Sequence, residues 1–196
     1  MSNVRPHFNR TDMGDRDPLT QALTRDAIHV VMGQFQDLGP IAQHSLLLID
    51  IDHFKHVNDT LGHDTGDLVL CEIVALLRSM VPAGSEVGRL GGDEFLVFLP
   101  GTGIVLAQEL AESIRGLFAS STRSGLTLTI GIATTPAEGQ WDCHQLVGLA
   151  DLRMVVAKKR LRPGRNCTWA GDLPAGWTGP HFLEWPTSAP YPPSAW

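Results

Sequence analysis

Hydrophobic residues recur along the chain with spacings that distinguish helices from strands. Residues 24–40 carry apolar side chains on one helical face and stop at a glycine-proline pair. The apolar positions of this face are Ala27, Val31, Phe35 and Leu38. Residues 44–51 are instead a continuous apolar run, typical of a strand covered on at least one side. The pattern therefore predicts a helix followed by a buried strand.

The rest of the chain continues to alternate between the two spacings. Helical periods recur in residues 65–80, 103–120 and 143–160, and strand-like runs occupy residues 85–90, 95–100 and 126–136. The resulting order is α, β, α, ββ, α, β, α. We expect an α+β sandwich, with a mostly antiparallel central sheet, a βαββαβ core and helices on its faces.

The two adjacent strand-like runs are joined by a turn with two acids. Residues 89–101 read RLGGDEFLVFLPG, in which Gly91 and Gly92 accept the positive φ values of a tight hairpin turn. Asp93 and Glu94 follow directly. Acids at such a tip are either solvated turn residues or a concentration of negative charge with a purpose.

A second acidic group helps to decide between these two interpretations. Asp50 and Asp52 end the apolar run at 44–51, and side chains two apart in a strand point to the same face. If this strand lies beside the hairpin, Asp50 and Asp93 converge at an exposed strand end. Converging carboxylates repel unless a cation lies between them, and Mg²⁺ prefers hard oxygen ligands. Either group alone is explained more simply by acids that cap strands or helices; together they favour a cation site.

The amino-acid composition excludes several classes of function. The net charge of −6 argues against a nucleic-acid polymer as partner, since phosphate backbones are held by clustered Lys and Arg. Three widely spaced cysteines, without a C-x-x-C pair, indicate neither a disulfide framework nor a zinc site. No apolar stretch is long enough for a membrane span, and the polar N-terminal region has no signal-peptide core. We expect a soluble cytoplasmic protein that does not bind a membrane.

The composition changes near the C-terminus. Residues 170–196 hold six of the 13 prolines and show neither helical nor alternating spacing. We expect a short lead at 1–16, one domain at 17–169 and an irregular Pro/Trp-rich tail at 170–196. Whether the aromatic side chains of the tail pack on the domain or meet a partner stays open.

Five segments in a fixed order make the sequence resemble the GGDEF-domain diguanylate cyclases, which condense two GTP molecules into cyclic di-GMP and release pyrophosphate. The segments are DPLTQALTR (17–25), DIDHFKHVNDTLGHDTGD (50–67), RLGGDEF (89–95), LTIGIA (128–133) and LADLRMVVAK with GRN (149–158 and 164–166). The resemblance implies a nucleotidyl-cyclase-like sandwich, GTP as substrate, cyclic di-GMP as product, and Mg²⁺ or Mn²⁺ as cofactor. It also implies catalysis in a homodimer, which need only be transient.

The resemblance assigns roles to the acidic residues and to one lysine. Asp50, Asp93 and the backbone carbonyl of Ile51 would hold the metal, and Glu94 would extend this acidic set. Asp93 fits the acceptor of the 3′-hydroxyl proton, although which carboxylate takes that proton stays open between Asp93 and Glu94. Lys55 would stabilise the transition state, a role that suits a compact cation near transferring phosphate.

Other matching residues would bind the nucleotide. Asn58 and Asp67 correspond to the pair that recognises the guanine edge, and His63 to a further substrate contact. Gly91 and Gly92 belong to the substrate-binding turn. Lys158 and Arg165 correspond to residues that contact the outer phosphates, although cations at a helix end are also ordinary. The separation of Lys158 from Gly164 is five residues where two are typical, which puts the role of Arg165 in doubt.

Several positions depart from the family pattern. Gln21 and Thr24 stand where glycine and asparagine are usual, and Arg153 and Val155 where alanine and tyrosine are common. Residues 82–85 read PAGS, which lacks the Arg-x-x-Asp pair that binds inhibitory product in many members. We therefore expect no strong product inhibition at this place.

Two other functions stay open at this point. One is a catalytically silent GTP-binding or interaction module of the same fold. The other is a related nucleotidyl cyclase with mixed or adenine-containing products. The complete set of acidic and basic residues favours an active diguanylate cyclase.

Overall fold

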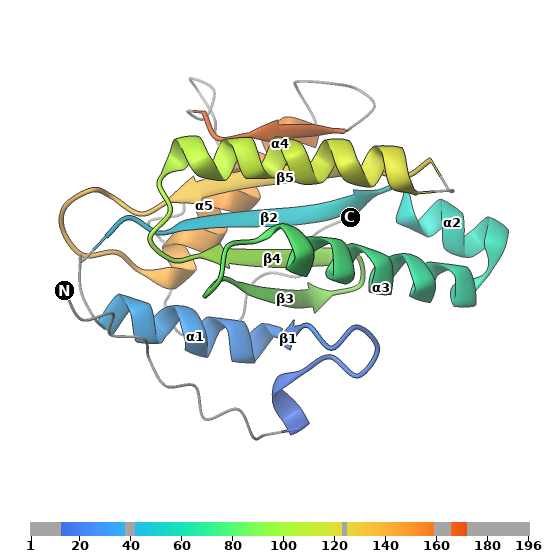
Figure 1. Ribbon diagram of the computed structural model, residues 1–196, viewed down its shortest axis with the longest axis horizontal. Coiled ribbons are helices and arrows are strands. Elements are labelled where there is room, and N and C mark those ends of the chain that lie inside the picture. The colour runs from blue at the N-terminus through green and yellow to red at the C-terminus, as the bar shows by residue number, and fades with distance from the viewer. Residues whose placement is uncertain (1–12, 38–41, 123–124, 159–165, 172–196) are drawn as a thin grey trace.

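The computed structural model describes residues 13–37, 42–122, 125–158 and 166–171 (Figure 1). The helices are the 3₁₀ helix η1 (Met13–Asp15), α1 (Arg25–Asp37), α2 (Phe54–Leu61), α3 (His63–Met80), α4 (Ile104–Ser121) and α5 (Cys143–Val156). The strands are β1 (Leu23–Thr24), β2 (Ser45–Asp52), β3 (Glu86–Gly91), β4 (Glu94–Leu99), β5 (Thr127–Thr134) and β6 (Cys167–Trp169). Arg165 and most of the predicted lead and tail lie outside the described residues.

One sheet runs through the centre of the molecule. Its strand order is β1-β3-β4-β2-β5-β6, and β2 pairs antiparallel with both β4 and β5. The hairpin β3–β4 is also antiparallel, whereas the short edge strands β1 and β6 run parallel to their neighbours. The predicted α+β fold with a mostly antiparallel sheet is confirmed.

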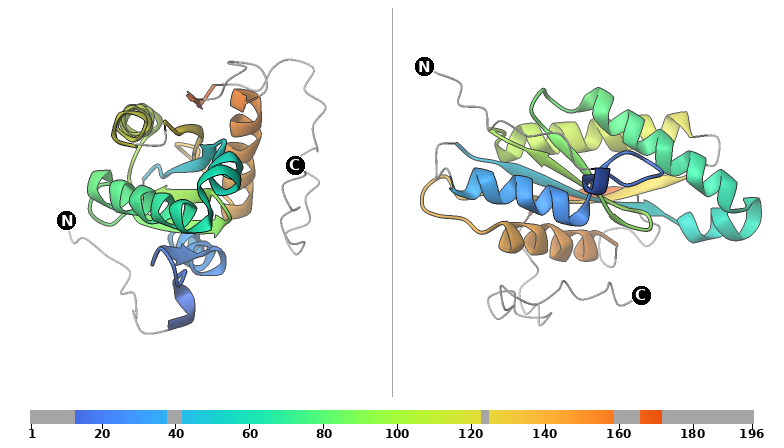
Figure 2. Two further views of the ribbon diagram at one scale, coloured as in Figure 1. Left: turned by 90° about the vertical axis from the view of Figure 1, so that its right-hand side faces the viewer. Right: turned by 90° about the horizontal axis from the view of Figure 1, so that it is seen from below.

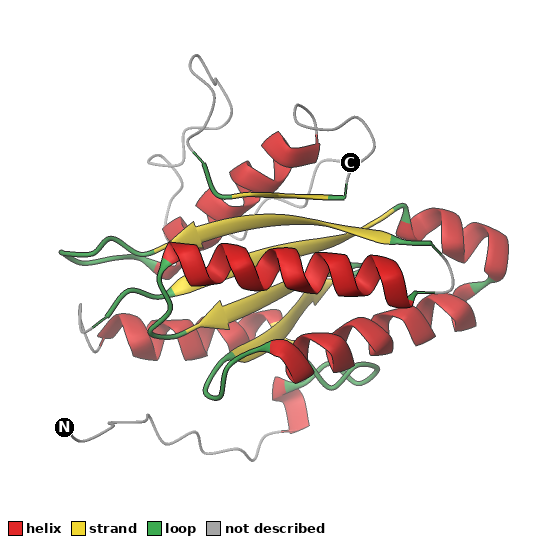
Figure 3. Cartoon of the chain, turned by 45° about the horizontal axis from the view of Figure 1, so that its top comes forward, coloured by secondary structure: helices red, strands yellow, loops and turns green. Residues whose placement is uncertain are grey.

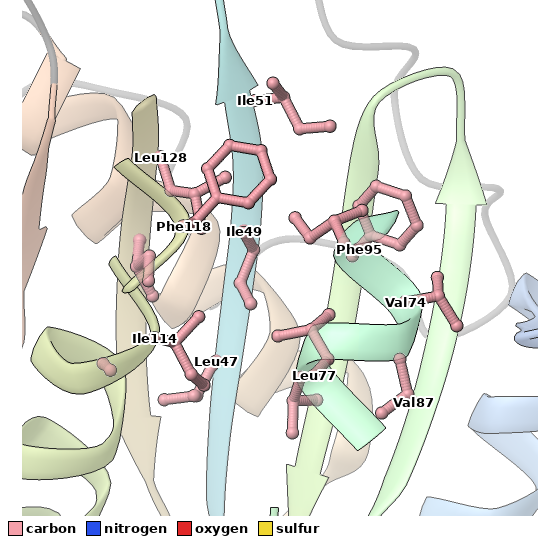
Figure 4. Packing of buried hydrophobic residues seen from close by; sticks show 14 of the residues in the cluster. Leu47, Ile49, Ile51, Val74, Leu77, Val87, Phe95, Ile114, Phe118 and Leu128 are labelled. Atoms are coloured by element: carbon pink, nitrogen blue, oxygen red, sulfur yellow. The ribbon is translucent and has the colours of Figure 1, made fainter. Parts of the chain in front are cut away.

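Helices cover both faces of the sheet, because the side chains of β2 alternate between two apolar clusters. Leu47, Ile49 and Ile51 pack with α3 and α4, as Figure 4 shows around Phe118 and Leu77. Leu46 and Leu48 pack with α1 and α5 on the opposite face. The end-on view of Figure 2 shows these layers, and Figure 3 shows α4 lying across the sheet. All eight residues of β2 are therefore buried, including its two acids.

Helix α5 lies unusually close to β5. A Cβ atom added to Gly131 would lie 1.9 Å from the carbonyl oxygen of Ala150 and 2.7 Å from the amide nitrogen of Met154. Glycine thus lets the helix backbone approach the strand directly. This contact fixes the height of α5 above the sheet.

The hairpin turn differs by one residue from its prediction. Gly91 and Gly92 both have positive φ values, 149° and 51°, as a tight turn requires. However, the two residues between the strands are Gly92 and Asp93, because a register shift between Arg89 and Gly91 brings Gly91 into β3. Asp93 therefore belongs to the turn itself.

Four short elements were not predicted, one of which is the three-residue 3₁₀ helix η1. Helix α2 has only eight residues, too few to show a helical period over several turns, although Phe54 and Val57 are both buried on it. Strands β1 and β6 have two and three residues and form at the sheet edges. None of the helices in the described part of the chain combines the length and hydropathy that a membrane crossing requires.

Candidate active site

Several elements meet at the end of the sheet where β2 finishes. Asp50 of β2 lies opposite Glu94 of β4 on one side and Thr129 of β5 on the other. The amide of Ile51 donates a hydrogen bond to the carbonyl of Asp93 at 3.3 Å, which joins β2 to the hairpin turn. Figure 1 shows β2 and β3 both ending on the side where α2 lies. The predicted convergence of the two acidic segments is therefore present.

Asp50 is a buried residue of the central strand β2 and does not lie at an exposed strand end. Asp50 is only 7% exposed, because β2 is a central strand and the side chain of Lys158, just after α5, lies against its carboxylate. Its Oδ2 atom accepts a hydrogen bond from Lys158 Nζ at 2.8 Å. Its Oδ1 atom is buried and has no hydrogen-bond partner among the described residues. The expected exposure of Asp50 is wrong, but its buried oxygen without a partner is what an absent cation would leave.

The acidic cluster, defined here as Asp50, Asp93 and Glu94, is electrostatically unfavourable without a cation. Burial raises the pKa of Asp50; the Lys158 ammonium opposes this, and the carboxylates of Asp93 and Asp52 raise it further. Burial also raises the pKa of Glu94, and the neighbouring Asp50 carboxylate adds to the rise. A positive charge in the cluster would stabilise its ionised form.

The acidic cluster fits a metal only if other ligands come with it. The described residues contain no group of three or more His, Cys, Asp or Glu side chains placed to hold a metal by themselves. Magnesium commonly uses one or two carboxylates together with water and substrate phosphates. The unsatisfied Oδ1 atom of Asp50 therefore fits a metal that binds together with a nucleotide.

Asp52 has a different role from Asp50 although both side chains share a face. Its carboxylate accepts hydrogen bonds from the hydroxyls of Thr127 and Thr129, both at 2.7 Å, and from the amide of Asn166 at 2.8 Å. It is fully buried. These contacts make Asp52 the residue that fixes the segment leading into β6. The alternation of side chains placed it on the same face as Asp50, and only the resemblance to the family left it out of the expected metal ligands.

The residues predicted to bind the nucleotide lie on α2 and α3. Lys55, His63 and Asp67 are exposed, and Asn58 is half-buried. A Cβ atom on Gly66 would lie 1.9 Å from Asn58 Oδ1, so the Asn58 side chain lies over the residue that precedes Asp67. The structure thus places the Asn58 side chain beside the residue next to Asp67, and their joint role in guanine binding stays a prediction.

Two residues near the site were missed by the sequence analysis. Arg89 donates from Nε and Nη2 to the carbonyl of Gly92, at 3.0 and 2.8 Å, and forms a 3.0 Å ion pair with Asp17. Asp151 of α5 raises the pKa of Glu94, after the larger effects of burial and Asp50. Its position seven residues before Lys158, on the same helical face, was a detectable signal.

These observations define a class of protein: an α+β sandwich that holds acidic and basic side chains together at one end of its sheet. The family model "Diguanylate cyclase, GGDEF domain" matches residues 15–164. The chain belongs to this family.

Curated relatives and solved structures agree with this assignment. Diguanylate cyclase DgcM of Escherichia coli K12 is 39% identical over 153 residues, which cover 76% of this chain and 37% of DgcM. Response regulator PleD of Caulobacter vibrioides is 43% identical over 129 residues, or 62% of this chain and 28% of PleD. The chain therefore spans well under half the length of these relatives. The coiled-coil and GGDEF-domain structure of DgcB from Caulobacter crescentus, in complex with c-di-GMP, superimposes with a TM-score of 0.71 at 26% identity, covering 80% of this chain and 85% of that one.

Proposed function

We propose that this domain is a diguanylate cyclase that condenses two GTP molecules into cyclic di-GMP and pyrophosphate. The observation that carries the proposal is the buried Oδ1 atom of Asp50, which has no partner within the described structure and lies in the acidic cluster. A structural acid would be satisfied by hydrogen bonds, as Asp52 is. Asp50 is instead arranged to receive a cation.

The chain's own residues have separate tasks in this reaction. Asp50, Asp93 and the Ile51 carbonyl would hold Mg²⁺ or Mn²⁺, and Glu94 would add negative charge. The bound metal would neutralise phosphate oxygens that gain charge as the α-phosphorus is attacked. Lys55 and Lys158 would contact phosphate, and either Asp93 or Glu94 would take the proton of the attacking 3′-hydroxyl.

The base specificity would come from α2 and α3. Asp67 would accept hydrogen bonds from N1–H and the amino group of guanine, with the Asn58 amide beside it. Adenine lacks both donors. His63 is exposed at the start of α3, where it would add a further contact to the nucleotide.

Two further features complete the proposal. Each domain would bind one GTP, so two copies must face each other for both 3′-hydroxyls to react. The loop between α3 and β3 contains Pro82, Ala83 and Gly84, all exposed, followed by Ser85. This loop offers neither a guanidinium nor a carboxylate, so the enzyme would lack product inhibition through an Arg-x-x-Asp site.

Incubation of the purified protein with GTP and Mg²⁺, followed by mass identification of the product, tests the proposal. Cyclic di-GMP is expected, and a parallel incubation with ATP should give little product. Bound GTP without product would instead support the silent module, and adenine-containing products would support a different cyclase specificity. Titration with cyclic di-GMP tests the inhibition site; submicromolar binding at residues 82–85 with matching inhibition would contradict its absence.

A further inference from the structure

Lys158 contacts the residue that is proposed to hold the metal. Its Nζ atom lies 2.8 Å from Asp50 Oδ2, and the two side chains are only 17% and 10% exposed. A lysine devoted to substrate phosphate alone would be expected to extend into solvent until the substrate binds. This one is instead withdrawn into the acidic cluster.

We propose that Lys158 is the counter-ion of Asp50 in the nucleotide-free domain, and that it transfers to phosphate when metal and nucleotide bind together. The inference rests on the proposed function in one respect, namely that Asp50 is a metal ligand. It adds a positioning role for Lys158, which makes binding of the metal depend on binding of the nucleotide.

The Asp50 carboxylate and the Lys158 ammonium are both largely buried, so each needs an opposite charge beside it. A metal that bound alone would place its two positive charges beside the ammonium on the same carboxylate. A nucleotide that bound alone and took Lys158 would leave Asp50 buried without a cation, beside Asp93 and Glu94. When both bind, the metal replaces Lys158 on Asp50 and phosphate replaces Asp50 on Lys158. Each ligand therefore strengthens the binding of the other.

This arrangement predicts a specific effect of neutralising the lysine. Lys158→Met keeps much of the apolar stem but removes the charge, so the nucleotide-free protein should bind metal more tightly, by at least about tenfold. Lys158→Arg keeps the charge and should remain within about threefold of the wild type. A lysine that served only as a phosphate contact would leave nucleotide-free metal binding unchanged in both variants.

The measurement is a titration of the nucleotide-free protein with Mn²⁺, with free Mn²⁺ followed by electron paramagnetic resonance. Titrations are repeated with 3′-deoxy-GTP, which lacks the attacking hydroxyl and so cannot react. For each variant, the Mn²⁺ dissociation constant measured without nucleotide is divided by the one measured with 3′-deoxy-GTP. This ratio should be at least tenfold smaller in Lys158→Met than in the wild type. Lys55→Met is the matched control, because Lys55 is an exposed lysine of α2; its nucleotide-free Mn²⁺ affinity should change by less than about threefold.

Unchanged or weaker nucleotide-free Mn²⁺ binding in folded Lys158→Met would overturn the inference. Lys158→Gln repeats the comparison with a polar side chain, and thermal unfolding confirms that each variant is folded. Adding Asp50→Asn to Lys158→Met should abolish the gain; retention of the gain would show that the metal binds elsewhere. Because no turnover is measured, these results stand apart from the product assay. Failure to form cyclic di-GMP would overturn the proposed function and leave the Mn²⁺ result intact.

Discussion

The acidic residues at the end of β2 differ sharply in what surrounds them. Asp52 is held by three hydrogen bonds, whereas Asp50 has one oxygen on Lys158 and one without a partner in the described structure. Two residues of identical chemistry, two positions apart, therefore differ in role: Asp52 supports the structure, and Asp50 is the one proposed to bind the metal. The strand pattern placed both on one face, and only the resemblance to the family singled out Asp50 as a metal ligand. The structural role of Asp52 was not predicted, because its partners come from β5 and from Asn166.

The Asp93 carboxylate of the turn gives a clear test of the proposed site. Asp93 is half-buried in the β3–β4 turn, so Asp93→Ala removes a proposed metal ligand without opening a cavity in the core. Product formation should fall by at least about 100-fold, since even indirect supports of metal sites contribute ten- to a hundredfold. Glu109→Ala, at an exposed position of α4, is the control and should retain activity. Near-normal turnover of Asp93→Ala would show that the site is assigned wrongly.

Gln21 is a second residue whose conformation allows a prediction. Its φ of 60° lies in the left-handed region, which is unfavourable for residues with a Cβ atom. Gln21→Gly should raise the free energy of unfolding by about 0.5–1 kcal/mol, after allowance for the extra flexibility of glycine in the unfolded chain. Urea unfolding measures the change. Gln34 is exposed in the middle of α1, so Gln34→Gly should instead lower the free energy of unfolding by about 1 kcal/mol. If both variants were destabilised by similar amounts, backbone strain at Gln21 would be contradicted.

At the scale of elements, Arg89 connects the β3–β4 turn to the segment before β1. Two of its hydrogen bonds end on the Gly92 carbonyl, and its ion pair with Asp17 adds a contact from a distant part of the sequence. The pKa of Asp17 is lowered: burial alone would raise it, but hydrogen bonds from Thr20 and the contact with Arg89 outweigh that effect. The turn is therefore supported from outside the hairpin.

Lysine cannot reproduce this planar set of donors, so Arg89→Lys should loosen the turn. We expect turnover to fall about ten- to a hundredfold through misplacement of Asp93. The Michaelis constant for GTP should change much less, because the residues proposed to bind the base lie on α2 and α3. Steady-state kinetics measures both. Asp17→Asn removes the ion pair but keeps the hydrogen bonds from Arg89 to Gly92, so it should lower turnover less. Equal losses of turnover in Arg89→Lys and Asp17→Asn would contradict the role of the hydrogen bonds to Gly92.

The elements also show what sequence could and could not predict. The long helices were predicted because burial of one face imposes a period over many residues, and β2 was predicted because burial on both faces makes it a continuous apolar run. Helix α2 buries only Phe54 and Val57 and follows His53, whose φ of 61° marks a sharp change in chain direction. The edge strands β1 and β6 form only because a neighbouring strand offers unpaired backbone groups. Their formation depends on tertiary contacts that no local pattern contains.

At the scale of the whole molecule, a group of buried aromatic rings lies at the other end of β2. His44 contacts Phe35, Phe98 and Trp141 and accepts a hydrogen bond at Nδ1 from the amide of Gly101 at 3.1 Å. Burial lowers the pKa of His44. Protonation at Nδ1 would also replace the acceptor of the Gly101 bond with a donor, so the folded protein holds His44 neutral.

The lowered pKa of His44 predicts how the free energy of unfolding depends on pH. As pH falls below about 6.5, the unfolded chain binds a proton at His44 before the folded protein does, so the free energy of unfolding decreases. The contribution is up to about 1.4 kcal/mol per pH unit until folded His44 titrates. Urea unfolding between pH 7 and 5 should show a smaller decrease in His44→Phe. His56→Gln, exposed on α2, is the control; equal slopes for wild type and His44→Phe would rule out this contribution.

The close contact of α5 with Gly131 restricts which residues position 131 can carry. A methyl group at this position would meet the helix backbone and lift α5, which leads to Lys158. Stability and activity would then be lost through one displacement, because the lysine would move away from Asp50. If random variants were selected for cyclic di-GMP synthesis and sequenced in depth, we expect codon 131 to remain glycine in almost every survivor. A position without a side chain would then be among the least variable of the domain.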